Sequence, residues 1–261
     1  MPELPDVQVF EEYVDATSLH QEITGVHADA EGLREGVSVR TLRRRLEGRR
    51  LRSTRRHGKH LFLEVEEDGW LRLHFGMTGS LQYFRGDQAP EHTKLLLDFP
   101  DGYHLAYVNV RKFGEIGFVD DVDAFVAEQE LGPDALDLDL GAFRERLSGR
   151  RGAIKGMLMN QEVLAGLGNE YTDEILFQAG IHPETPTNEL SEETTERLHR
   201  CMREVVAAAV GARVEPERMP DDFLLPHRAE GEECPRCGRA IEKIEVSGRP
   251  TYLCPAEPKR S

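Results

Sequence analysis

The spacing of hydrophobic residues changes part-way along this 261-residue chain, and the change limits the folds that it can adopt. Between residues 60 and 119, apolar and polar residues alternate in short runs such as His60–Val65 and Trp70–Phe75, with glycine-rich turns between them. This alternation predicts short strands that form a β-sandwich or barrel ending near residue 122. From residue 142 to 210 the apolar residues recur every three to four positions, which predicts helices. The chain is therefore expected to have an α+β, multidomain fold.

Proline-rich and cysteine-containing segments divide the rest of the chain. Short helices are expected at Val7–Leu19 and from Val39 to Gly48, with a strand at Ile23–Val26 between them. Ser191 is a suitable N-cap for a long helix over 192–210. The polar, proline-rich segment 213–226 is typical of a linker. We predict three domains, at residues 1–122, 130–212 and 226–261.

The charge of the chain is uneven. The formal net charge is −15, yet residues 34–59 contain eleven Arg and Lys and two Glu, a net of +9, so the remainder carries −24. A local basic patch can bind DNA on an acidic protein, although a solvated helix face is the alternative interpretation. No apolar run approaches the ~20 residues of a membrane span, and the N-terminus lacks a signal-peptide pattern. A cytoplasmic location is expected.

The N-terminal sequence Met-Pro-Glu-Leu-Pro-Asp contains a candidate nucleophile. Removal of the initiator methionine would leave Pro2 with a free secondary amine. Roughly a tenth of an ordinary α-amine is uncharged at neutral pH, against well under a thousandth of a lysine amine. A neutral amine can form a Schiff base with a carbonyl-like carbon, and Glu3 could be its acid/base partner. Chance occurrence of these residues is the alternative.

The C-terminal cysteines have the spacing of a metal site. Cys234 and Cys237 form a Cys-x2-Cys pair, and Cys254 follows after sixteen residues. This spacing is typical of a structural zinc site on a β-hairpin. The expected fourth cysteine is absent, so Glu257 is the candidate fourth ligand and His227 an alternative. A degenerate finger without metal remains open.

Two further segments could contact phosphates. The glycine-rich stretch at 166–168 opens a helix whose backbone amides could bind an anion, and Lys155 on the preceding helix could face the same anion. Arg249 lies beside Gly248 at the tip of the cysteine hairpin, where a guanidinium could bind phosphate. A simple helix hairpin and a solvated arginine are the alternatives.

Four motifs together indicate a family. They are the Met-Pro-Glu-Leu-Pro-Asp start, His-Phe-Gly-Met-Thr-Gly at 74–79, Arg-Lys-Phe-Gly at 111–114, and the eighteen-residue stretch 166–183. With the cysteine hairpin, they resemble the formamidopyrimidine-DNA glycosylase / endonuclease VIII family of base-excision repair enzymes. The resemblance extends over essentially the whole chain. It implies an N-terminal β-sandwich, a helix-two-turn-helix domain and a zinc-finger-like hairpin, with DNA bound between the two large parts.

The resemblance also implies roles for individual residues. Pro2 would attack C1′ of the damaged nucleotide and expel its base, and Glu3 would act as the general acid that opens the sugar. The resulting iminium permits elimination of the flanking phosphates, so the enzyme would be both a glycosylase and an abasic-site lyase. The other matched residues would bind phosphate or fill the gap left by the flipped nucleotide. The phosphate-binding residues would be Lys59, Asn169 and Arg249, and the wedge residues would be Met77, Arg111 and Phe113.

Three departures from the family pattern concern specificity and stability. Asp6 stands where the family commonly has glutamate, and the fourth zinc cysteine is missing. The segment 212–226 is shorter than the usual lesion-covering loop and has no threonine-rich counterpart of it. Ring-opened purines, oxidised pyrimidines and abasic sites are therefore as compatible with the sequence as 8-oxoguanine.

We thus expect a monomeric, zinc-containing, bifunctional DNA glycosylase that acts on damaged double-stranded DNA and is associated with the nucleoid. The main alternative is a protein that binds lesions or abasic sites without excising them. The paired Pro2 and Glu3 argue against that alternative, because binding alone does not need both. A second alternative, a structural zinc-dependent adaptor, predicts no salt-sensitive affinity for DNA.

Overall fold

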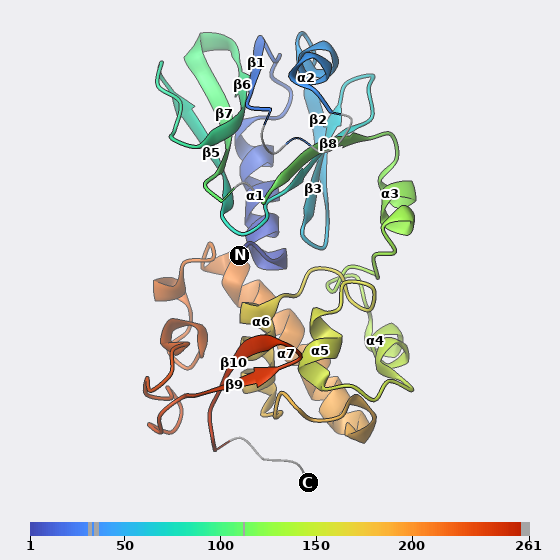
Figure 1. Cartoon of the computed structure of the whole chain (residues 1–261), viewed down its shortest axis with the longest axis vertical. Helices are drawn as coiled ribbons and strands as arrows, with labels where there is room; N and C mark the ends of the chain where they lie inside the picture. Colours follow the sequence, from blue (N-terminus) through green and yellow to red (C-terminus); the bar gives the residue numbers. More distant parts are fainter. Residues whose placement is uncertain (31–32, 34–36, 112, 257–261) are drawn as a thin grey trace. The chain divides into compact units, whose positions relative to one another are not determined.

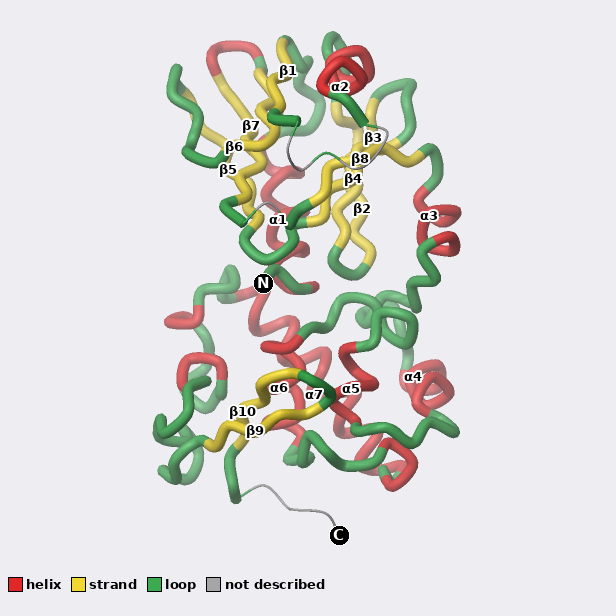
Figure 2. Tube along the Cα trace, viewed as in Figure 1, coloured by secondary structure: helices red, strands yellow, loops and turns green. Residues whose placement is uncertain are grey.

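The structure is a computed structural model that describes residues 1–30, 33, 37–111 and 113–256. It divides into two compact units (Figure 1). The N-terminal unit comprises residues 1–2 and 7–129, and the C-terminal unit comprises residues 3–6 and 130–261. Strands dominate the N-terminal unit and helices the C-terminal unit (Figure 2).

The N-terminal unit contains two four-stranded antiparallel sheets. One has the order β1 (Gly25–Ala28), β6 (Thr93–Asp98), β7 (Tyr103–Asn109) and β5 (Gly79–Arg85). The other has the order β2 (Leu51–His57), β3 (His60–Val65), β4 (Trp70–His74) and β8 (Glu115–Val119). The single-turn 3-10 helix η1 (Pro100–Gly102) connects β6 to β7.

The two sheets share one hydrophobic core. Leu61, Leu71 and Ile116 from one sheet and Leu97 from the other are all at most 1% exposed and belong to the same apolar cluster. Helix α1 (Leu4–Thr17) contributes Val7 and Val14 to this cluster, and α2 (Val39–Leu46) contributes Leu42 and Leu46. A third helix, α3 (Val122–Glu128), follows β8. The alternating strands thus bury their apolar face, as a sandwich requires.

The C-terminal unit is built around a pair of packed helices. Helix α6 (Asn169–Ala179) packs against α7 (Glu192–Gly211), and α4 (Leu140–Leu147) and α5 (Ile154–Met159) complete the helical core. Ser191 caps α7, because its side chain accepts a hydrogen bond from the Thr194 amide. The 3-10 turns η2 (Thr187–Glu189), η3 (Pro216–Arg218) and η4 (Leu225–His227) lie between the larger elements. The hairpin of β9 (Glu242–Val246) and β10 (Arg249–Leu253) packs on α6.

The predicted fold class is confirmed: a β-sandwich is followed by a helical region and a C-terminal hairpin. Strand β3 has the predicted bounds, while β1 begins two residues later than the predicted strand. Strand β2 was not predicted, because its arginines hide the alternation of apolar residues. The three-domain division stays a prediction, although the hairpin lies within the C-terminal unit. Among the described residues, no helix is both long and apolar enough to cross a bilayer.

Candidate active site

Glu3 is held by the first turn of α6. Its side chain is buried, and its carboxylate accepts hydrogen bonds from the backbone amides of Gly168 at 2.7 Å and Glu170 at 2.9 Å. The Tyr171 amide is a third donor, at 3.4 Å. The first amides of a helix have no partner within the helix and attract negative charge. The sequence left open whether an anion binds at this helix end; in the structure the Glu3 carboxylate accepts from the amides of Gly168, Glu170 and Tyr171.

Two glycines make this close approach possible. A Cβ atom at Gly168 would lie 2.4 Å from the Glu3 Cδ, and one at Gly166 would lie 2.6 Å from the Leu4 Cδ1. Gly166 also has a φ of +115°, and its carbonyl accepts a hydrogen bond from the Leu4 amide at 3.0 Å. The N-terminal segment of the chain therefore packs directly against this loop.

Asp6 stabilises the same segment. Its carboxylate accepts a hydrogen bond from the Glu3 amide at 2.9 Å, which closes the first turn of α1. Burial raises the pKa of Asp6 to about 6, and Glu170 adds to the rise. The carboxyl group with this raised pKa lies in the first turn of α1, four residues after Pro2 in the sequence. The backbone is anchored at two successive amides, because the Glu3 amide donates to Asp6 and the Leu4 amide donates to the Gly166 carbonyl.

The predicted wedge residues lie on two neighbouring loops of the N-terminal unit. Met77 is in the β4–β5 turn, and Arg111 and Phe113 follow β7. Met77 is 41% and Phe113 65% exposed, which is unusual for large apolar side chains. The Arg111 guanidinium lies 4.0 Å from the Met77 sulfur. The structure therefore brings Met77 and Arg111 together and leaves Phe113 open to solvent.

A buried polar group supports these two loops. Asn109 is 1% exposed and donates to the Phe75 carbonyl at 3.3 Å and to the Tyr107 hydroxyl at 3.0 Å. The Tyr107 hydroxyl in turn donates to the His74 carbonyl at 2.9 Å. Burial lowers the pKa of His74 to about 4, so its imidazole is neutral at pH 7. We assigned no role to Asn109 or Tyr107 from the sequence, because a polar residue in a strand gives no sign that it is buried.

Lys59 lies at the turn between β2 and β3, directly after Gly58, whose φ is +56°. This turn belongs to the N-terminal unit, whereas Asn169 and Arg249 belong to the C-terminal unit. In the C-terminal unit, Asn169 donates its side-chain amide to the Pro250 carbonyl at 2.9 Å. Asn169 is therefore hydrogen-bonded to Pro250, the residue that follows the exposed Arg249.

Lys155 does not face solvent, and its predicted place beside a bound phosphate is wrong. Its side chain is fully buried, and its ammonium lies 2.6 Å from the Asp173 carboxylate. It also donates to the Thr251 hydroxyl at 2.7 Å and to the Pro250 carbonyl at 3.2 Å. These three acceptors match the three N–H donors of an ammonium, so none remains for DNA.

The three hairpin cysteines converge. The sulfur atoms of Cys234, Cys237 and Cys254 all lie within 4.8 Å of one another, and the last two are 3.3 Å apart. Thiolates that share a tetrahedral zinc at Zn–S distances of ~2.3 Å are separated by roughly 3.8 Å, so the cluster fits that ion. Among the described residues no fourth ligand joins the cluster. Glu257, the predicted fourth ligand, lies outside the described residues.

Comparison with known proteins identifies the family of the chain. Residues 1–116 match the formamidopyrimidine-DNA glycosylase N-terminal domain, and residues 131–218 match the H2TH domain of the same enzymes. Residues 231–256 match the zinc finger found in FPG and IleRS. This chain belongs to the formamidopyrimidine-DNA glycosylase family.

Relatives of this family are similar along their full length. The chain is 36% identical to the formamidopyrimidine-DNA glycosylase of Geobacter metallireducens, over 98% of both proteins. It is 34% identical to that of Lactococcus lactis, again over 98% of both. A solved complex of a Lactococcus lactis FPG variant with Fapy-dG-containing DNA superimposes with a TM-score of 0.87 and 32% identity, covering 99% of this chain and 100% of that one. A complex of the Lactococcus lactis enzyme with abasic-site DNA gives a TM-score of 0.84 and 31% identity, at the same coverage.

The family assignment also identifies the metal of the hairpin. The match to the zinc finger and the converging thiolates support structural zinc, as the cysteine spacing predicts. Zinc bound here would crosslink the Cys234–Cys237 turn to the end of β10 at Cys254.

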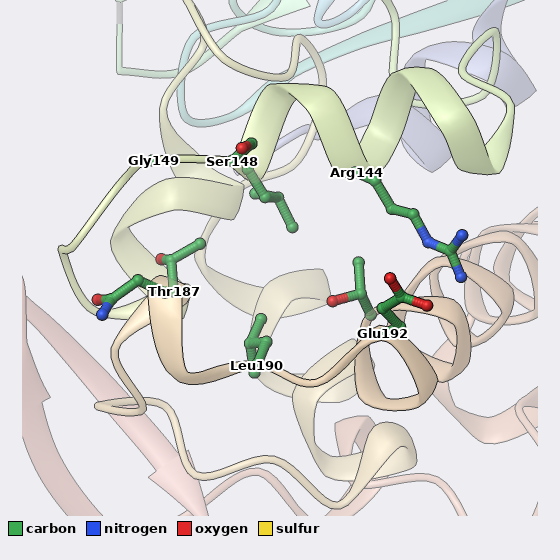
Figure 3. Close-up of a pocket in the computed structure, with 9 residues that line it drawn as sticks. Arg144, Ser148, Gly149, Thr187, Leu190 and Glu192 are labelled. Carbon is green, nitrogen blue, oxygen red and sulfur yellow. The ribbon is translucent and has the colours of Figure 1, made fainter.

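A separate cavity lies outside these groups. It has a volume of about 330 Å³ and is lined by Arg144, Leu147 and Ser148 from the α4 region and by Thr187, Leu190 and Glu192 near the start of α7 (Figure 3). None of the predicted site residues lines it. We assign it no part in the chemistry of this formamidopyrimidine-DNA glycosylase family member.

Proposed function

We propose that this protein excises damaged bases from DNA through a Schiff base on Pro2 and then cleaves the strand by elimination. The observation that carries the proposal is the anchoring of Glu3 by the amides of Gly168 and Glu170. Because Pro2 immediately precedes this anchored residue, its amine is restricted to a small volume. A restricted amine has a high effective concentration at the C1′ atom of a bound nucleotide, which lowers the barrier to attack.

The proposed reaction has two stages. The Pro2 nitrogen attacks C1′ of the damaged nucleotide and gives its proton to the Glu3 carboxylate, while the bond from C1′ to the base breaks and the base leaves with a proton from water. Glu3 then passes its proton to the ring oxygen as the sugar opens. The iminium that results acidifies the C2′ proton, and its loss expels the 3′ phosphate by β-elimination. A further elimination expels the 5′ phosphate, and water then releases the sugar remnant from Pro2.

The exposed loops of the N-terminal unit suit the base-flipping step. An enzyme that attacks the sugar must take the nucleotide out of the duplex, and apolar wedges commonly fill the space that it leaves. Exposure of 41% for Met77 and 65% for Phe113 makes both available for insertion. Arg111, beside Met77, supplies a cation that could pair with the orphaned base.

Phosphate contacts are proposed for Lys59, Asn169 and Arg249. Lys155 is omitted from this set because its ammonium is buried in the protein. The substrates that we favour are ring-opened purines, oxidised pyrimidines and abasic sites, because the segment 212–226 is short for a lesion-covering loop. We further propose that the protein works as a monomer on chromosomal DNA in the cytoplasm.

Borohydride trapping on a duplex with one abasic site tests the proposal. We expect a covalent adduct from protein whose intact mass shows that the chain begins at Pro2. The adduct should disappear when Pro2 is replaced by glycine behind an added N-terminal residue. Absence of an adduct from a chain that begins at Pro2 would remove the lyase mechanism and favour a lesion-binding protein without excision activity.

A further inference from the structure

Lys155, Asp173 and Arg228 form a buried ion cluster in the C-terminal unit. The Lys155 and Asp173 side chains are 0% exposed and that of Arg228 is 14% exposed. Asp173 accepts from Lys155 at 2.6 Å and from the Arg228 guanidinium at 2.7 Å and 3.0 Å. The three residues come from α5, from α6 and from the segment after η4. The cluster therefore joins three parts of the chain that are distant in sequence.

The same cluster holds the strand that follows Arg249. The Thr251 hydroxyl accepts from the Lys155 ammonium at 2.7 Å and donates to the Arg249 carbonyl at 3.0 Å. The Tyr252 amide donates to Asp173 at 3.2 Å, and the Arg228 guanidinium lies 4.6 Å from the centre of the Tyr252 ring. A continuous chain of hydrogen bonds thus runs from the buried ammonium to the backbone of Arg249.

The tip of the hairpin is also in close contact with α5. A Cβ atom at Gly156, next to Lys155, would lie 2.6 Å from the Ser247 hydroxyl. Ser247 precedes Gly248 and Arg249 in the turn, with φ angles of +52° and +71° at the first two. The turn that carries Arg249 therefore packs closely against α5 at Gly156.

The cysteines lie at the other end of the hairpin. Arg249 opens β10 opposite Val246, whereas Cys254 follows its last residue, Leu253. Five residues of extended strand span roughly 16 Å at ~3.3 Å per residue. Metal at the cysteines would therefore act on the end of the hairpin that is distant from Arg249.

We propose that the buried cluster of Lys155, Asp173 and Arg228, and not the metal, sets the position of Arg249 beside Asn169. The three are positioning residues for the phosphate contact, and this inference rests on the proposed function of Arg249. The buried Asp173 carboxylate is bonded to protein groups: the Lys155 ammonium, the Arg228 guanidinium and the Tyr252 amide. Removal of Asp173 would leave the buried Lys155 ammonium without a counter-charge, whereas removal of either cation leaves Asp173 paired with the other.

Salt titrations of DNA binding test the link from Lys155 to Arg249. The probe is a duplex with a tetrahydrofuran abasic analogue, which the amine cannot open. Removal of one phosphate contact reduces the slope of log affinity against log salt by about 0.9. We expect this reduction, with roughly ten- to hundredfold weaker binding, for Arg249→Ala and for Thr251→Val alike, with no further loss in the double variant.

Three further variants make the result specific. Thr251→Ser keeps the hydroxyl and should restore the wild-type slope. Lys155→Met tests the ammonium directly. Arg144→Met is the matched control, since it removes a partly exposed cation 3.6 Å from Glu196 in the same unit and should leave the slope unchanged. A wild-type slope for Thr251→Val, or additive losses in the double variant, would overturn the proposal.

Amide hydrogen exchange of the free protein separates this inference from the proposed function. The Tyr252 amide should exchange about tenfold faster in Thr251→Val and Lys155→Met. Chelation, with zinc content measured, should speed exchange at residues 234–238 and leave Tyr252 near its original rate. If chelation releases Tyr252 as strongly as Lys155→Met does, the metal sets the position and the inference is wrong. If Arg249→Ala leaves the salt slope unchanged, Arg249 does not contact phosphate and that part of the proposed function is wrong. Exchange at the Tyr252 amide then still tests whether the buried cluster holds this strand in place.

Discussion

Substitution of Gly168 by alanine isolates the contact between Glu3 and α6. The backbone of Gly168, with φ −131° and ψ −156°, is extended and open to any residue, so alanine adds a methyl group without backbone strain. That methyl would lie 2.4 Å from the Glu3 Cδ and 2.8 Å from its Cγ. Carbon atoms pack at ~3.5–4.0 Å, so the carboxylate must move by about 1 Å or more.

The displacement weakens the hydrogen bonds that Glu3 accepts. The Gly168 bond, now 2.7 Å, would exceed the range of a hydrogen bond, and the Glu170 bond at 2.9 Å would lengthen. Each hydrogen bond to a charged group contributes ~1.5–3 kcal/mol. Loss of one such bond, with an acid displaced by ~1 Å, predicts excision that is slower by roughly ten- to hundredfold.

Single-turnover excision on a duplex with one ring-opened guanine measures this effect, beside urea unfolding of the same proteins. Gly211→Ala is the matched control, because a Cβ atom at the end of α7 meets nothing within 4 Å. Equal excision rates for Gly168→Ala, Gly211→Ala and wild type would refute the steric reasoning. A rate loss that merely follows a loss of folded protein at the assay temperature would refute it as well.

Three more predictions follow from the same geometry. Glu3→Gln should reduce base excision by at least about 10²-fold while duplex binding stays near wild type, and surviving excision would show that Glu3 is not the acid. Because the pKa of Asp6 is raised to about 6, folding takes up a proton, so stability is highest below pH ~4 and falls as pH rises through 6. Relative to Asp6→Asn, wild type should lose up to about 3 kcal/mol of unfolding free energy between pH 4 and 7, and a constant difference in urea titrations would contradict this. Phe113→Ala should slow excision but leave the unfolding free energy within about 0.5 kcal/mol, because the ring is 65% exposed, and a clear drop in stability would assign Phe113 to the core.

Much of this protein could be predicted from its sequence alone. The change in the spacing of hydrophobic residues distinguishes the β-sandwich from the helical region. Each spacing follows from local backbone geometry, since side chains alternate along a strand and recur every three to four residues along a helix. Short motifs identify the family because the residues of each motif are close together in the chain, as with Pro2 and Glu3, the glycine-rich loop, and Cys234 with Cys237. The N-cap at Ser191 was predictable for the same local reason.

Only the tertiary structure decides which partners the polar residues have. Glu3 and Gly168 are 165 residues apart, so no local pattern shows that a carboxylate occupies the amides of α6. Lys155 looks like a surface cation in sequence, yet Asp173 and the start of β10 enclose it completely. Burial and charge compensation depend on all the elements that pack around a side chain, and those contacts arise only when distant segments of the chain meet.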